Sequence, residues 1–319
     1  MVGEATFRSN SVQSTREGPC SGAAIFNQGT VRLRGGAVFT DNFVYANRDG
    51  EGAGDGGAVW NGATARTIVD SAAMLEHNGV GAGGRGGALW NEGFVEFRGA
   101  TLFQSNLVSC ESDEGGGGGM FNQGGLVRFK EEAAFCENEA QAGSAFVNAA
   151  GGRVMLHEET SIDGNVSLEE ESSIAGAVWN QANSLLSAKK AISWDGNRGY
   201  NAAGMLNYGK VVFRGELSVR DNTAVMDGGG FINESGAAMV FYKGAEFLTN
   251  VGTGYGGAIL NHARLEFKGG DDGHITLKFE DNYCGEQECQ DIQNKDGSNV
   301  SGLRDVSDLC DIGTQDIVA

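Results

Sequence analysis

The most catalyst-like grouping in this chain is a pair of carboxylates beside a histidine. Asp271, Asp272 and His274 stand in the sequence GGDDGH at 269–274. A carboxylate and an imidazole held close together can act as an acid–base pair. Neighbouring residues of a strand point to opposite faces, however, and this segment lengthens one repeat of the chain. We therefore interpret it as an inserted surface turn.

The other three histidines have no evident acid–base companion. His77 and His157 stand where related segments carry other polar residues, which indicates outward side chains. His262 directly follows an asparagine in an expected turn. The sequence therefore predicts no catalytic, cofactor-binding or metal-binding residue, and a protein that is not an enzyme.

Carboxylates also gather in three variable segments, 48–57, 110–119 and 167–173. Calcium takes about six to eight oxygen ligands, which flexible acidic loops can supply. None of the three segments has the DxDxDG order of a calcium loop, so we expect solvated loops. Calcium in the acidic loops remains the alternative, and no other cofactor is expected.

Basic residues recur at one place in the pattern, directly after an alternating apolar segment. Six of the chain's 23 lysines and arginines stand there, namely Arg34, Arg98, Lys130, Arg214, Lys243 and Lys268. If the segments stack, these side chains form a column whose members are ~4.8 Å, or a multiple of it, apart. Nearby carboxylates such as Glu132 and Glu216 would neutralise the column. Alternatively, it is a cationic stripe that binds an anionic polysaccharide.

The overall charge restricts the partners of this chain. Its formal net charge is −19, and a strongly acidic molecule repels nucleic acid and anionic lipid. No apolar run reaches the length of about 18 residues that a membrane-spanning helix needs. We expect an acidic polysaccharide or another surface protein as the partner, no nucleic acid and no membrane span.

Six cysteines occur, and none forms a CxxC pair. An even number without a zinc or redox motif is compatible with disulfides in an oxidising compartment. Cys110 and Cys136 fall one repeat apart near the same expected corner, where they could bridge adjacent coils. We therefore expect an extracellular or cell-surface location, although the first ten residues contain no signal segment.

Two asparagine-ending motifs alternate along the chain. The first is a hexapeptide with copies GAAIFN 22–27, GGAVWN 56–61, GGALWN 86–91, GGGMFN 117–122, GSAFVN 143–148, AGAVWN 175–180, AAGMLN 202–207, GGGFIN 228–233 and GGAILN 256–261. The second has the form FxxN, as in FRSN 7–10, FTDN 39–42, FQSN 103–106, FCEN 135–138, FLTN 247–250 and FEDN 279–282. The two asparagines of a cycle are 15 to 17 residues apart in eight of nine cycles, whereas the return segment varies from 10 to 19. A constant arm and a variable arm indicate a coil with one variable loop.

A third apolar patch with period two lies between the two asparagines, as in Val95-x-Phe97 and Val127-x-Phe129. Such alternation indicates a half-buried strand. No cycle contains the helical pattern that a βαβ unit needs. The sequence therefore predicts an all-β solenoid, a right-handed single-stranded parallel β-helix of about ten rungs with three short strands each.

Stacking of the coils would place each kind of asparagine in a ladder. An amide both donates and accepts, so identical asparagines one coil apart can hydrogen-bond along the stack and satisfy turn backbone. Asparagine also tolerates the left-handed backbone conformation. The first expected ladder is Asn27, Asn61, Asn91, Asn122, Asn148, Asn180, Asn207, Asn233 and Asn261. The second is Asn42, Asn78, Asn106, Asn138, Asn165, Asn197, Asn222, Asn250 and Asn282.

The two motifs resemble the repeats of the polymorphic outer membrane protein family, which are marked by GGA[ILV] and FxxN. Here they stand as GGAV 56–59, GGAL 86–89, GGAI 256–259 and the FxxN series, over residues 7 to about 294. The resemblance implies the β-helical passenger of a surface adhesin and carries over no catalytic residue. In that family an outer-membrane barrel follows the repeats.

The repeats divide the chain into three expected parts. Residues 1–21 are an incomplete first coil, residues 22–294 are the β-helix, and residues 295–319 are a tail or partial cap. Because FRSN closes a cycle whose earlier strands are missing, we expect an incomplete N-terminus. Residues 1–20 would then be poorly ordered or would lie across the open first coil.

Two functions of different classes fit these observations. The first is a non-catalytic repeat scaffold, an adhesin or structural protein of the cell surface that binds glycans. The second is a polysaccharide-active enzyme, a lyase or hydrolase, on the same fold. The second requires at least two carboxylates together with an arginine or histidine on one outer face.

Overall fold

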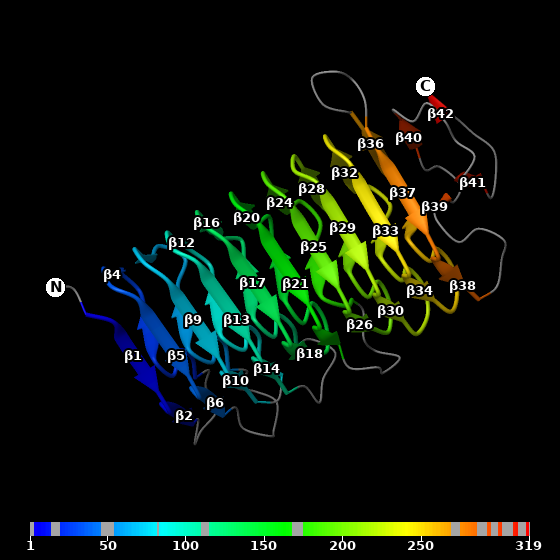
Figure 1. Ribbon diagram of the computed structural model, residues 1–319. Helices are drawn as coiled ribbons and strands as arrows, with labels where there is room; N and C mark the ends of the chain where they lie inside the picture. The colour runs from blue at the N-terminus through cyan, green and yellow to red at the C-terminus, as the bar shows by residue number, and fades with distance from the viewer. Residues whose placement is uncertain are drawn as a thin grey trace.

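The computed structural model is a right-handed parallel β-solenoid of about nine turns (Figure 1). Strands of successive coils lie side by side along the rod, and no helix occurs in the part of the chain that the structure describes. The fold class predicted from the sequence is confirmed. The described residues are 3–13, 20–45, 54–81, 83–109, 115–167, 175–268, 275–285, 292–294, 299–301, 309–311 and 317–318.

Four parallel sheets run the length of the rod, and we number each by its first strand. Sheet 1 carries the FxxN motifs and consists of β1 (Ala5–Arg8), β5 (Ala37–Thr40), β9 (Ala73–Glu76), β13 (Thr101–Gln104), β17 (Ala133–Cys136), β21 (Thr160–Asp163), β25 (Ile192–Asp195), β29 (Leu217–Arg220), β33 (Ala245–Leu248) and β37 (Leu277–Glu280). Sheet 2 consists of the short strands β2 (Ser11–Gln13), β6 (Phe43–Tyr45), β10 (Gly79–Val80), β14 (Leu107–Val108), β18 (Glu139–Ala140), β22 (Val166–Ser167), β26 (Arg198–Gly199), β30 (Thr223–Ala224), β34 (Val251–Gly252) and β38 (Tyr283–Cys284).

Sheets 3 and 4 contain the hexapeptides and the alternating patches. Sheet 3 consists of β3 (Ile25–Asn27), β7 (Val59–Asn61), β11 (Leu89–Asn91), β15 (Met120–Gln123), β19 (Phe146–Ala149), β23 (Val178–Asn180), β27 (Met205–Asn207), β31 (Phe231–Asn233), β35 (Ile259–Asn261), β39 (Ile292–Asn294) and β41 (Leu309–Asp311). Sheet 4 consists of β4 (Thr30–Leu33), β8 (Arg66–Val69), β12 (Phe94–Phe97), β16 (Leu126–Phe129), β20 (Arg153–Leu156), β24 (Leu185–Ala188), β28 (Lys210–Phe213), β32 (Ala238–Phe241), β36 (Arg264–Phe267), β40 (Asn299–Ser301) and β42 (Ile317–Val318).

Each complete coil therefore has four strands where the sequence predicts three. The additional strand is the sheet 2 strand, which directly follows each FxxN motif and has only two residues in most coils. Two residues cannot show an alternating pattern, because the period of a strand is itself two residues. The three predicted strands correspond to sheets 3, 4 and 1.

The core is a continuous stack of inward side chains. The phenylalanines of the FxxN motifs face inward on sheet 1, and neighbouring rings stack, with centroids of Phe103 and Phe135 4.8 Å apart. Phe247 and Phe279 repeat this contact at 5.3 Å. Full burial of such a side chain stabilises the fold by roughly 1.5–3 kcal/mol. The phenylalanines of the FxxN motifs thus form an inner wall of the core.

Both predicted asparagine ladders are present and unbroken. In the first, from Asn27 to Asn261, each Nδ2 donates to the Oδ1 of the next coil at 2.7–2.9 Å. The second runs from Asn10 to Asn282 with distances of 2.8–3.0 Å. Asparagines of the second ladder also accept a backbone N–H from the preceding coil, so each one joins the coils on both sides.

The left-handed backbone conformation does not fall on the ladder asparagines, contrary to our expectation. It falls on the residue directly before each asparagine of the second ladder, for example at φ 53° for His77 and 55° for Glu137. An L-amino acid other than glycine in the left-handed backbone conformation costs about 1–2 kcal/mol of conformational free energy. The following asparagine offsets this because its amide hydrogen-bonds to the neighbouring coils.

The described parts of the chain termini continue the coils. β1 pairs with β5, and β2 pairs with β6. These two N-terminal strands therefore form half of a coil that stacks on the first complete coil. At the other end, β39 pairs with β35, and β40, β41 and β42 extend sheets 3 and 4.

We predict that removal of one ladder amide destabilises the whole rod. Asn207 donates to Asn233 and accepts from Asn180 and from the backbone N–H of Gly209. Asn207→Ala leaves these buried groups without a partner, so the free energy of unfolding should fall by about 1–3 kcal/mol. Chemical denaturation followed by circular dichroism measures this change.

Asn201→Ala is the matched control, because Asn201 is partly exposed and lies outside both ladders. Its effect should stay within about 0.5 kcal/mol. Equal losses for Asn201→Ala and Asn207→Ala would show that the ladder does not carry stability.

Candidate functional site

The predicted basic column lies directly after the strands of sheet 4. The register follows from backbone hydrogen bonds: Lys130 N donates to Phe97 O at 2.9 Å and Lys189 N donates to Leu156 O at 2.9 Å. The same bond repeats in the other coils. In nine successive coils the column consists of Arg34, Asp70, Arg98, Lys130, His157, Lys189, Arg214, Tyr242 and Lys268.

The register corrects the predicted membership of the column. Lys243 lies one residue beyond it, and Tyr242 holds its place, because Tyr242 N donates to Phe213 O at 2.9 Å. Lys189 belongs to the column but was missed, since Ala188 before it lacks the bulky apolar side chain that closes the other strands.

The ends of the column are neutralised by carboxylates. Arg98 contacts Glu96 at 2.6 Å and Asp70 at 3.0 Å, and Asp70 also pairs with Arg32. Lys268 lies 3.4 Å from Glu266. The cations at the ends are thus compensated, as the sequence predicts. The carboxylates that compensate them are Glu96, Asp70 and Glu266 and not Glu132 or Glu216.

The middle of the column is not neutralised. Lys130, Lys189 and Arg214 form no ion pair with any residue that the structure describes, and Arg214 instead stacks over the ring of Tyr242 at 5.0 Å. Glu246, the carboxylate that follows Lys243 by three residues, pairs instead with Arg220 at 2.7 Å. The coil before His157 and the two coils after it therefore present uncompensated cations.

The column is part of a larger basic face. The outer face of sheet 4 and its turn into sheet 1 carry 14 of the chain's 23 lysines and arginines. Besides the six lysines and arginines of the column they are Arg32, Arg66, Arg128, Arg153, Lys190, Lys210, Lys243 and Arg264. We call this surface the basic face.

His157 reports the positive potential of the basic face. Burial and the charges of Lys189, Lys130 and Arg128 lower the pKa of its imidazole, whereas Glu158 opposes this. Lys189 Nζ lies 3.5 Å from His157 Nδ1. Burial and the neighbouring cations therefore favour the neutral form of this imidazole at the centre of the column.

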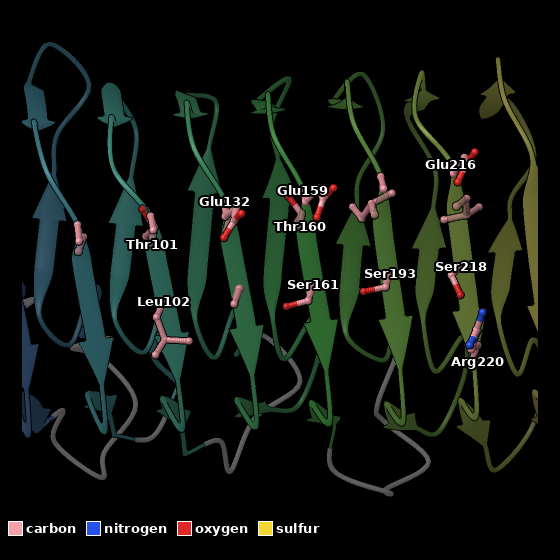
Figure 2. A pocket seen from close by; sticks show the side chains of 18 of the residues that line it. Thr101, Leu102, Glu132, Glu159, Thr160, Ser161, Ser193, Glu216, Ser218 and Arg220 are labelled. Atoms are coloured by element: carbon pink, nitrogen blue, oxygen red, sulfur yellow. The ribbon is translucent and has the colours of Figure 1, made fainter. Parts of the chain in front are cut away.

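A second lengthwise surface lies on the outer side of sheet 1. It is a trough of about 950 Å³ that crosses the strands (Figure 2). Its floor is a column of in-register side chains that changes from apolar to hydroxyl along the rod, namely Val38, Met74, Leu102, Ala134, Ser161, Ser193 and Ser218. Figure 2 shows Glu132, Glu159 and Glu216 along one rim, before the strands begin.

A carboxylate column borders the hydroxyl half of the trough. Asp163, Asp195 and Arg220 stand in register on β21, β25 and β29. Burial, Asp163 and Asp221 raise the pKa of Asp195, and Arg220 partly opposes them. Two carboxylates and an arginine are thus brought together on one outer face, which the sequence did not predict. The signal was available in the first x position of the FxxN-like segments IDGN 162–165, WDGN 194–197 and VRDN 219–222, because that position faces outward.

Several predicted features fall outside the described residues. They are the segment 269–274, Cys110, and most of the acidic loops that could hold calcium. Cys136 is half-buried, and burial together with Asp163 raises the pKa of its thiol. Its pairing with Cys110 stays a prediction, because Cys110 lies outside the described residues. No metal-binding group of histidine, cysteine and acidic side chains is found within the described ranges.

A third cluster, outside sheet 3, is structural in character. Arg85 stacks over Trp90 and Phe121 at 4.5 and 5.5 Å and pairs with Asp55 at 3.4 Å. Asp55 has a side chain only 14% exposed, and burial raises its pKa to about 6 although Arg85 opposes this.

These observations define the protein as a right-handed parallel β-solenoid with a basic and an acidic surface along its length. No family model, curated protein or solved structure matches the chain. The described part of the chain has no helix that could span a membrane.

We predict that Asp55 makes stability depend on pH. A carboxyl whose pKa is raised on folding favours the folded state below its ordinary pKa of 3.8, and this advantage is lost as the pH rises through about 6. The free energy of unfolding should fall by roughly 3 kcal/mol between about pH 4 and pH 7. Urea unfolding at several pH values measures the slope.

Asp55→Asn removes the titrating group and should flatten this part of the pH profile. If the slope persists unchanged in Asp55→Asn, another group is responsible.

Proposed function

We propose that the protein is a non-catalytic β-solenoid scaffold of the cell surface or extracellular space that binds an anionic polysaccharide along its basic face. The observation that carries the proposal is the uncompensated middle of the basic column, at Lys130, Lys189 and Arg214. The chain has 42 acidic and 23 basic residues, so an uncompensated row of cations is unusual for its composition.

The spacing of the column suits a regular polymer. Its members follow one another at about the strand spacing, ~4.8 Å, so the column extends over roughly 40 Å from Arg34 to Lys268. A chain that carries a carboxylate or sulfate on each sugar can approach several cations at once. Arginines on this face, such as Arg153 and Arg214, can bind such groups through two parallel hydrogen bonds.

The acidic remainder of the molecule supports selectivity. Nucleic acid has a high and continuous negative charge that the other surfaces repel. The location outside the cell and the resemblance to a surface adhesin family remain part of this proposal.

We predict that the double variant Lys189→Glu/Arg214→Glu loses affinity for polygalacturonate by about tenfold or more, because two attractive charges become repulsive. Titration calorimetry at low and moderate salt measures the loss. The matched control is Arg8→Glu/Arg198→Glu, which changes the net charge equally but lies on sheets 1 and 2. The control should bind as the unaltered protein does.

The pKa of His157 gives a second readout. A bound polyanion favours the protonated imidazole, so the pKa should rise and binding should strengthen as the pH falls. Equal loss in the control variant, a His157 pKa that does not move, or tighter binding of duplex DNA would contradict the proposal.

A second candidate function, a polysaccharide-active enzyme, is favoured by Asp163, Asp195 and Arg220 in one register column. Carboxyl groups about 5–5.5 Å apart serve as nucleophile and acid in retaining glycosidases, and in-register strands are ~4.8 Å apart.

Product analysis separates the two functions. If the scaffold proposal holds, polysaccharides incubated with the protein keep their length and release no new reducing ends or unsaturated products. Shortened products that form with the unaltered protein but not with Asp195→Asn would contradict the scaffold proposal and support the enzyme.

A further inference from the structure

The trough on sheet 1 has the shape of a site for an extended polymer. It runs straight across the strands, and its floor repeats one side chain per coil at ~4.8 Å. The lining extends from Glu4 to Thr276, and thus over nearly the whole rod. A small molecule would occupy only a fraction of such a site.

The hydroxyl half of the trough has unused hydrogen-bonding groups. Ser161, Ser193 and Ser218 are half-buried, lie in register, and have no hydrogen-bond partner among the described residues. Each hydroxyl can both donate and accept. A ligand with hydroxyl groups at the spacing of the coils would satisfy all three.

The charge of this half is strongly negative. The carboxylates in and beside the trough that form no ion pair with any described residue are Glu132, Glu159, Asp163, Asp195 and Glu216. The single cation of the lining, Arg220, is bound to Glu246 at 2.7 Å. The raised pKa of Asp195 has the repulsion of Asp163 and Asp221 among its causes, so a ligand cation here would relieve it.

We propose that the trough binds an extended polysaccharide with free amino groups, a polymer of hexosamine units, with about one unit per coil. The ammonium groups lie against the carboxylates, and the ring hydroxyls hydrogen-bond to the serine column. In the other half of the trough, the apolar side chains of Val38, Met74 and Leu102 contact the C–H faces of the rings. This site adjoins the basic face along the turn into sheet 1 but uses other residues, and it goes beyond the proposed function.

The spacing favours a glycan over a peptide. In an extended peptide, side chains on one face recur every second residue, at about 6.6 Å, which does not match the coils. A pyranose ring with its linking oxygen is close in length to one coil. The strands of sheet 1 are already paired with both neighbours, so a peptide strand cannot add to the floor by backbone hydrogen bonds.

The test measures binding of the full chain to a glucosamine hexamer, an N-acetylglucosamine hexamer and free glucosamine by titration calorimetry. We expect the glucosamine hexamer to bind at least about tenfold tighter than either of the others, and to weaken as salt rises. Acetylation removes the positive charge and keeps the ring and its hydroxyls. Comparable affinity for both hexamers would overturn the proposal.

Two variants locate the site. Glu159→Gln/Asp195→Asn keeps the shapes and removes two charges, and should weaken hexamer binding about tenfold or more. Ser193→Leu blocks the trough without a change of charge and should have a similar effect. The control Glu139→Gln/Glu234→Gln alters two carboxylates outside the trough lining and outside the column of Asp163 and Asp195, and should bind normally. Circular dichroism confirms that each variant is folded.

Other occupants give different results. The protein could self-associate in a salt-sensitive way, and Glu159→Gln/Asp195→Asn could abolish this association. That result would show that the trough binds the basic face of a second copy, and it would overturn the glycan proposal. Tighter binding of an oligolysine than of the hexamer would assign it to a basic peptide. The variant Lys189→Glu/Arg214→Glu should keep hexamer binding while it loses polygalacturonate, so this inference and the proposed function can fail separately.

Discussion

The hydrogen bond between ladder asparagines of successive coils is the interaction on which the rest of the structure depends. A solenoid without it could slip by one residue, which would turn every inward side chain outward. Asn78 shows how slippage is prevented, because its amide accepts from Asn42 and donates to Asn106 and to the carbonyl of Phe39. Its place relative to both neighbouring coils is therefore fixed.

With the register fixed, chemistry on the surface appears in columns rather than in pockets of the usual kind. A residue type that recurs in the pattern becomes a row of like groups about one strand spacing apart. This explains how a chain of net charge −19 has a basic face, with Lys189 and Arg214 in its centre, beside a trough edged by Glu159 and Glu216. Burial, together with neighbouring like charges, lowers the pKa of His157 and raises the pKa of Asp195.

Sequence reasoning located part of these surfaces. It identified Arg98, Lys130 and Arg214 because each follows a segment that ends in a bulky apolar residue. It missed Lys189, which follows Ala188, and it included Lys243, where Tyr242 takes the column position. Counting residues along the chain assigns the wrong residue to a column wherever one turn differs in length. Only the hydrogen-bonded register shows which residues of successive coils are neighbours.

The sequence by itself determined the fold: the period, the inward phenylalanines and both asparagine ladders follow from residue types that recur at nearly constant spacing. These are local requirements, since each coil must satisfy its own turns and bury its own apolar side chains. Only the tertiary structure decided the surface chemistry. Asp195 is 32 residues after Asp163 and 25 residues before Arg220 in the sequence, yet the three residues stand in register on adjacent strands. Electrostatic potential is a sum over such neighbours in space, and no segment of the sequence contains that sum.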